Sequence, residues 1–129
     1  ISMDGQEIYG EFSALLGEVL KEELPQGIAA FNFNLYEGED AFDIQLIGAS
    51  RFDEADDDWA CDEAFSSEED VYYLPRESED IEWQEGLSCA ADLVDLYLDQ
   101  GQYAGKLKAA QAVAIGFVDG DLTILYTRE

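Results

Sequence analysis

Seven carboxylates fall within eleven residues, from Asp53 to Glu63, and they surround a single tryptophan. Carboxylates at this density serve three kinds of chemistry. They bind hard cations such as calcium, they transfer protons in acid–base catalysis, or they present a negative surface to a positively charged partner. The residues that we assign to this candidate site are Asp53, Glu54, Asp56, Asp57, Asp58, Trp59, Asp62 and Glu63.

A built metal site is not what this pattern predicts. In the EF-hand loop a glycine follows the acidic ligands at a sharp turn, and no glycine stands in this segment. Histidine is absent from the chain, and Cys61 and Cys89 alone cannot supply the four ligands of an ordinary zinc site. We therefore expect no metal and no cofactor, and weak calcium binding at most. Cys61 and Cys89 are expected to be two reduced, buried thiols, with a disulfide between them as the alternative.

Catalysis is also disfavoured by the residue types. A catalytic carboxylate pair sits in an apolar cleft that raises the pKa of one partner, whereas a crowded acidic run indicates an open, polar setting. Without histidine there is no Ser–His or Cys–His nucleophile pair, and neither glycine-rich phosphate motif occurs. The sequence predicts a protein that is not an enzyme, with a small carboxylate-based hydrolase as an alternative.

The whole chain is acidic as well. It carries 31 acidic and 6 basic side chains on 129 residues, a formal charge of −25. Charge of this size opposes compaction, and solubility needs a net charge of only roughly 2–8 in a small domain. Because 15 of the 31 acids lie between Asp53 and Glu85, the excess predicts a surface that meets a basic protein. Nucleic acids and acidic membranes would be repelled.

Aromatic side chains in and after the acidic segment have two interpretations. Trp59 is either an apolar anchor in an interface with charges at its rim or a ring that packs onto the domain's own core. Tyr72, Tyr73 and Trp83 are either a binding platform or, as we expect, half-buried core residues with a polar tip at the surface.

Two segments show the spacing of apolar side chains that is typical of amphipathic helices. The first spans residues 4–24, with one apolar face made by Ile8, Phe12, Leu15, Leu16, Val19 and Leu20. The second spans residues 82–100, with a core face made by Leu87, Ala90, Ala91, Val94, Tyr97 and Leu98. Gly101 follows the second helix directly and is expected to end it.

Segments with period-two alternation predict strands at residues 28–36, 41–49, 71–74, 112–118 and 122–127. The first two are expected to form a hairpin with one solvated face, and Asp119-Gly120 predicts a type I′ turn between the last two. Residues 50–70 show no period and are expected to form a long loop. The order of elements predicts one α+β domain over residues 1–129, a mainly antiparallel sheet of about five strands with two main helices packed on one face.

Three segments carry a resemblance to a known class of proteins. They are Asp57-Asp58-Trp59-Ala60-Cys61-Asp62-Glu63, the hairpin from Val113 to Asp121, and the helical Val94-Asp95-Leu96-Tyr97-Leu98 before it. In these segments the chain resembles the small acidic immunity proteins of bacterial polymorphic-toxin and contact-dependent inhibition systems. The resemblance implies a cytoplasmic protein that binds and neutralises a cognate basic protein toxin, for example a nuclease, and it brings no catalytic residues.

Other functions fit the same composition. A DNA-mimic inhibitor of a DNA-binding protein would also be acidic, and duplex DNA would compete with it for its target. A domain from a salty habitat would spread its carboxylates evenly, whereas here they concentrate between residues 53 and 85. We expect a monomer or weak homodimer, since two copies of this charge repel each other.

Overall fold

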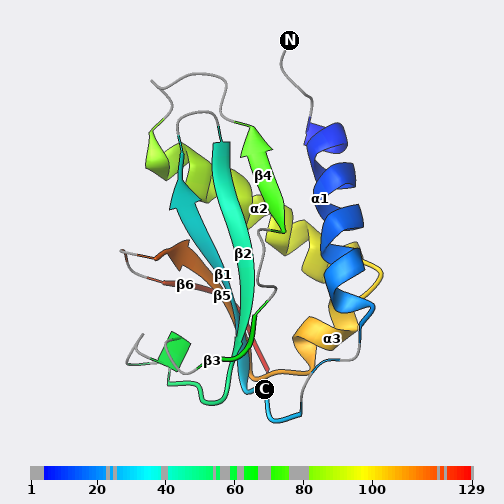
Figure 1. The fold of residues 1–129 in the computed structure, drawn as a ribbon, viewed down its shortest axis with the longest axis vertical. Coiled ribbons are helices and arrows are strands. Elements are labelled where there is room, and N and C mark those ends of the chain that lie inside the picture. Colours follow the sequence, from blue (N-terminus) through cyan, green and yellow to red (C-terminus); the bar gives the residue numbers. More distant parts are fainter. Residues whose placement is uncertain are drawn as a thin grey trace.

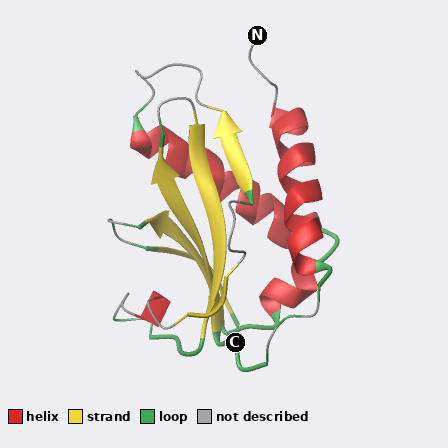
Figure 2. Cartoon of the chain, in the orientation of Figure 1, coloured by secondary structure: helices red, strands yellow, loops and turns green. Residues whose placement is uncertain are grey.

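Across the residues that the structure describes, a six-stranded, mostly antiparallel sheet packs with three helices (Figure 1). The computed structural model describes residues 5–22, 24, 26–38, 41–53, 55, 59–60, 63–66, 71–75, 82–118, 120 and 122–128. Figure 2 shows the helices and strands in separate colours. In chain order they are α1 Gly5–Leu20, β1 Ala30–Glu37, β2 Ala41–Ala49, β3 Glu63–Ser66, β4 Tyr72–Pro75, α2 Trp83–Gln100, α3 Ala104–Lys108, β5 Ala112–Phe117 and β6 Thr123–Thr127. The α+β class predicted from the sequence is confirmed.

β1 lies at the centre of the sheet, whose order is β3-β2-β1-β5-β6. It pairs antiparallel with β2 and parallel with β5, so that Asn32 lies between Ile47 and Ala114. β3 and β4 both pair antiparallel with β2, at its opposite ends. Every described pairing except that of β1 with β5 is therefore antiparallel, as expected for a fold built from hairpins.

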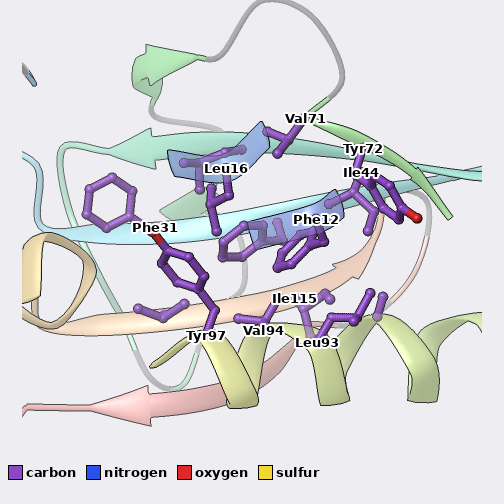
Figure 3. Close-up of a cluster of buried hydrophobic side chains, with 14 of the residues drawn as sticks. Phe12, Leu16, Phe31, Ile44, Val71, Tyr72, Leu93, Val94, Tyr97 and Ile115 are labelled. Carbon is purple, nitrogen blue, oxygen red and sulfur yellow. The ribbon is translucent and has the colours of Figure 1, made fainter. Parts of the chain in front are cut away.

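One face of the sheet packs against the helices and holds the main core (Figure 3). Phe12 of α1 lies at the centre of this core. Its ring centroid lies 6.4 Å from that of Phe33, 6.0 Å from that of Tyr72 and 6.4 Å from that of Tyr97. These partners belong to β1, β4 and α2, so this one ring joins the sheet to both long helices. The predicted core face of α1 fails only at Leu15, which is 45% exposed.

The opposite face of the sheet is also partly buried, which corrects the prediction of one solvated face. Trp59 packs there on small side chains of β1, β2 and β5, namely Ala30, Ala49, Ala112 and Ala114. Alanine leaves room above the sheet, and the large indole ring fills it. Asn32 of β1 is fully buried on this face, where its side-chain amide donates a hydrogen bond of 2.6 Å to Asn34 Oδ1.

Two element boundaries differ from the prediction. α1 ends at Leu20 rather than at residue 24, and Lys106 Nζ donates hydrogen bonds to the backbone oxygens of Leu20 and Glu22 at this end. Residues 63–66, expected in the long loop, form β3. This strand forms because Phe65 pairs with Gly48 and packs its ring against the main core.

The two-residue turn predicted at Asp119-Gly120 would pair Val113 with Tyr126 and Ile115 with Ile124. Val113 does pair with Tyr126, but Ile115 pairs with Thr123, because a bulge separates the two parts of the ladder. Gly120 lacks the positive φ that a type I′ turn requires. In the described part of the chain, no helix combines the length and the apolar character needed to cross a membrane.

Candidate functional site

The structure describes three of the eight residues assigned to the acidic site. They are Asp53, Trp59 and Glu63. Asp53 and Glu63, which lie at the two ends of the segment, are exposed, so both carboxylates face solvent. The other five site residues, Glu54, Asp56, Asp57, Asp58 and Asp62, lie outside the described residues.

Asp53 has a local structural role besides its charge. Its Oδ1 accepts a hydrogen bond of 2.9 Å from the backbone nitrogen of Ala55. This contact is the turn that an aspartate makes with the backbone two residues later, and it satisfies a donor that no strand or helix uses. The carboxylate therefore shapes the start of the acidic segment while it stays exposed to solvent.

Trp59 is buried in this structure, in line with the second of the two interpretations that the sequence allows. The side chain is only 1% exposed, and its ring lies edge-on to Phe52 with a centroid distance of 5.3 Å. The structure therefore shows the alternative interpretation, in which this ring packs onto the sheet. The physical reason is the row of alanines beneath it, which offers the indole more buried apolar contact than a loop surface would.

Several of the basic side chains make contacts with other residues of the protein. Lys21 Nζ lies 2.6 Å from a carboxylate oxygen of Glu18, and Lys106 caps the end of α1. Lys108 Nζ lies 5.9 Å from the ring centroid of Tyr126, and Arg128 donates a hydrogen bond of 3.0 Å to the backbone oxygen of Ala109. These contacts lie around the end of α1, α3 and the end of β6.

A groove of about 820 Å³ between α1 and α2 is a second candidate site that the sequence analysis missed. Its apolar lining comes from Ile8 and Tyr9 of α1, Leu74 of β4, and Leu93 and Leu96 of α2. Leu96 is 39% exposed, so the groove presents apolar surface to solvent. A signal for it exists in the sequence, because Leu93 and Leu96 lie outside the predicted core face of this helix.

Carboxylates crowd the α2 side of this groove. Burial, followed by the negative charge of Asp92, raises the pKa of the Asp95 carboxyl above its ordinary value. Burial, followed by the charges of Asp92 and Glu85, raises the pKa of the Cys89 thiol. Both shifts have the direction expected where negative groups lie close together and few cations offset them. Cys89 is a free thiol on the surface, which corrects the expectation that it is buried.

The Tyr72, Tyr73 and Trp83 set divides between core and surface. Tyr72 is buried, and its hydroxyl donates a hydrogen bond of 3.0 Å to Glu11 Oε1. Burial and then this hydrogen bond raise the pKa of Tyr72 to about 12. Tyr73 is 59% exposed and Trp83 is 48% exposed, although the Trp83 ring lies edge-on to Phe117. The expectation of half-buried core residues is wrong for Tyr73.

No family model, curated protein or solved structure matches this chain. The chemistry of the site therefore has to be judged from its own residues. Within the described ranges, no group of three or more histidine, cysteine or acidic side chains is placed to hold a metal ion. The described surface offers exposed carboxylates beside apolar side chains, an arrangement suited to binding a basic protein.

Proposed function

We propose that this chain is a non-enzymatic inhibitor of the immunity-protein kind, which neutralises a basic protein toxin by covering the toxin's positive surface. The charge imbalance carries this proposal. The chain has 31 acidic and 6 basic side chains, and the five basic residues that the structure describes all make contacts inside the chain. The remaining negative charge has to be balanced from outside, by salt or by a cationic partner.

The mechanism is electrostatic steering followed by occlusion. A field of this strength speeds encounter with a positive surface, to about 10⁸–10⁹ M⁻¹s⁻¹ at low salt. If the toxin is a nuclease, its phosphate-binding site is the positive surface with the greatest need of counter-charge. An acidic inhibitor that occupies that site excludes the nucleic acid without any chemical step. Such an inhibitor acts in the compartment where its toxin acts, the cytoplasm in this proposal.

The acidic segment from Asp53 to Glu63 is the proposed contact surface. Its two described carboxylates are exposed at the ends of the segment, and Trp59 supports the segment from the protein side by packing on the sheet. This division of roles places charge at the surface and the aromatic ring in the core. The proposed interface therefore depends on carboxylates, and Trp59 contributes by fixing where the chain runs.

The test is co-expression of this chain with the products of the adjacent genes. The cognate toxin should arrest growth when expressed alone and should lose that effect when this chain is present. The purified pair should form a complex in gel filtration, and its association rate should fall steeply with added NaCl. Lysozyme, a basic protein that is not cognate, provides the control for general charge attraction. The proposal would be refuted if this chain relieved the growth arrest caused by none of the neighbouring gene products and formed a complex with none of them.

A pair of charge reversals tests the location of the interface. Glu63→Lys changes a described, exposed carboxylate of the acidic segment, and Glu22→Lys changes an exposed carboxylate after α1. Both variants alter the net charge equally, so a general field effect should slow association equally. The proposed interface predicts a larger loss of association rate for Glu63→Lys. Equal rates for the two variants would place the contact surface elsewhere on the protein.

A further inference from the structure

Most of the apolar surface of α2 packs in the main core, which contains Ala90, Leu93, Val94 and Tyr97. Leu93 also lines the groove of about 820 Å³ on the α1 side of the helix, together with Leu96, which is 39% exposed. An amphipathic helix at a protein surface usually needs one apolar stripe, so a partly exposed second one indicates an unfilled contact.

The shape of the groove suits a helix. Its lining residues on α2 run from Cys89 to Gln100 and recur every three or four positions, which places them on one ridge of the helix. The eleven helical steps from Cys89 to Gln100 span about 16 Å, or about three turns. The lining is mostly apolar, and Gln6, Asp92 and Gln100 contribute polar groups.

The edge of this groove is negative. Glu85, Asp92 and Asp99 are spaced seven residues apart and therefore lie along one edge of α2, with Asp95 close to Asp92. None of the basic residues that the structure describes lines the groove. Burial, and then the charge of Asp92, raises the pKa of Asp95. An occupant must therefore combine apolar side chains with positive charge.

We infer that the groove between α1 and α2 binds a basic amphipathic helix of the protein partner. The inference rests on the proposed function and adds a second contact surface, because the groove lies on the helix-covered face of the sheet whereas Trp59 packs on the opposite face. Its apolar side chains would contact Leu93, Leu96 and Ile8, and its lysine or arginine side chains would face the carboxylates of α2. A second copy of this chain would bring another acidic surface against the first, and an anionic lipid would meet the same repulsion.

The experiment uses a synthetic helical peptide of about 18 residues, long enough to cover the α2 ridge. The peptide contains only leucine and lysine, with leucine on one face, and its control replaces every lysine with glutamate. Calorimetry on the full chain should show one bound lysine peptide, weakened by NaCl, and no binding of the glutamate peptide. Alkylation of Cys89 by iodoacetamide, followed by peptide mass mapping, should slow when the lysine peptide is bound, because Cys89 lines the groove.

Two matched leucine variants locate the binding. Leu96→Gln removes apolar surface inside the groove, and Leu15→Gln removes it from an equally exposed position of α1 that does not line the groove. Neither change alters the charge. Leu96→Gln should weaken peptide binding at least about tenfold, and Leu15→Gln should change it by less than about twofold. Equal effects of the two variants, or unchanged protection of Cys89, would overturn the inference.

The same variants separate this inference from the proposed function. A cognate toxin that binds Leu96→Gln as tightly as the unmodified chain, and is still neutralised, would overturn the groove inference and leave the proposed function intact. A groove that binds the lysine peptide while no adjacent gene product is neutralised would refute the proposed function alone. A dimer that Leu96→Gln dissociates would show that a second copy occupies the groove, and the inference would be wrong.

Discussion

Replacing Trp59 by alanine tests the core role of this ring. A buried tryptophan removes about 150–250 Å² from water, and at about 25 cal/mol per Å² this amounts to roughly 4–6 kcal/mol as an upper bound. Measured costs of aromatic-to-alanine changes in cores are about 3–5 kcal/mol. Since Trp59 is 1% exposed, we expect Trp59→Ala to lower the free energy of unfolding by about 3–5 kcal/mol.

Trp83 provides a matched control, because the chain has two tryptophans and Trp83 is 48% exposed. Its ring contacts Phe117 edge-on, with a centroid distance of 5.9 Å. Half of the apolar surface then remains in solvent, and Trp83→Ala should cost roughly 2 kcal/mol. Trp59→Phe keeps an aromatic ring over the alanines and should recover part of the loss at position 59.

The assay is urea denaturation followed by far-ultraviolet circular dichroism, since tryptophan fluorescence changes with the substitutions themselves. The unfolding midpoint and slope together give the free energy of unfolding. The core assignment fails if Trp59→Ala costs less than about 1 kcal/mol, or no more than Trp83→Ala does. A stable Trp59→Ala protein with much weaker toxin binding would instead restore the interpretation of Trp59 as an interface anchor.

Four further outcomes follow from the structure. Gly86→Ala should lower the free energy of unfolding by about 1–3 kcal/mol in urea denaturation, because a Cβ at this position would lie 2.6 Å from a buried aromatic ring. Gly10→Ala should raise the free energy of unfolding, because its Cβ would meet no atom within 4 Å and alanine favours the helix. Raising NaCl from about 0.02 to 0.3 M should raise the melting temperature, because screening relieves the excess negative charge. The pKa of Tyr72 is raised from 10.0 to about 12 in the folded state, so the unfolded chain loses this proton first as the pH rises. The free energy of unfolding should therefore fall between pH 10.0 and about 12, and it should fall less in Tyr72→Phe. In low-salt urea denaturation, Asp99→Asn should raise stability and Glu85→Gln should lower it, each by about 0.3–1 kcal/mol, because they lie at opposite ends of the α2 dipole.

Regular periodicity explains why most of the fold was predictable from the sequence. The second long helix was predicted at residues 82–100 and is found at Trp83–Gln100. β1 and β2 also lie close to their predicted ranges, because aromatic and aliphatic residues alternate there with small or polar ones. The parallel pairing of β1 with β5 could not be read from local patterns, because it joins strands that are far apart in the sequence.

The missed features depend on contacts between distant segments. β3 is only four residues long and shows no period, and it exists because Phe65 meets Gly48 across the sheet edge. The burial of Trp59 depends on alanines from three separate strands. The groove requires α1 and α2 to come together, so the second apolar stripe of α2 had no visible partner in the sequence.

The acidic residues near the C-terminal end of α2 are unfavourable for the stability of the helix. A helix favours acids in its first turn and bases in its last, and α2 follows the first preference with Glu85. It has no basic residue in its last turn, where Asp99 lies instead, and Asp95 one turn earlier is held close to Asp92. Both placements cost stability through the helix dipole and through like-charge repulsion, and no contact within the main core requires them. If the groove binds a cationic helix, as we infer, that helix would relieve both costs at once.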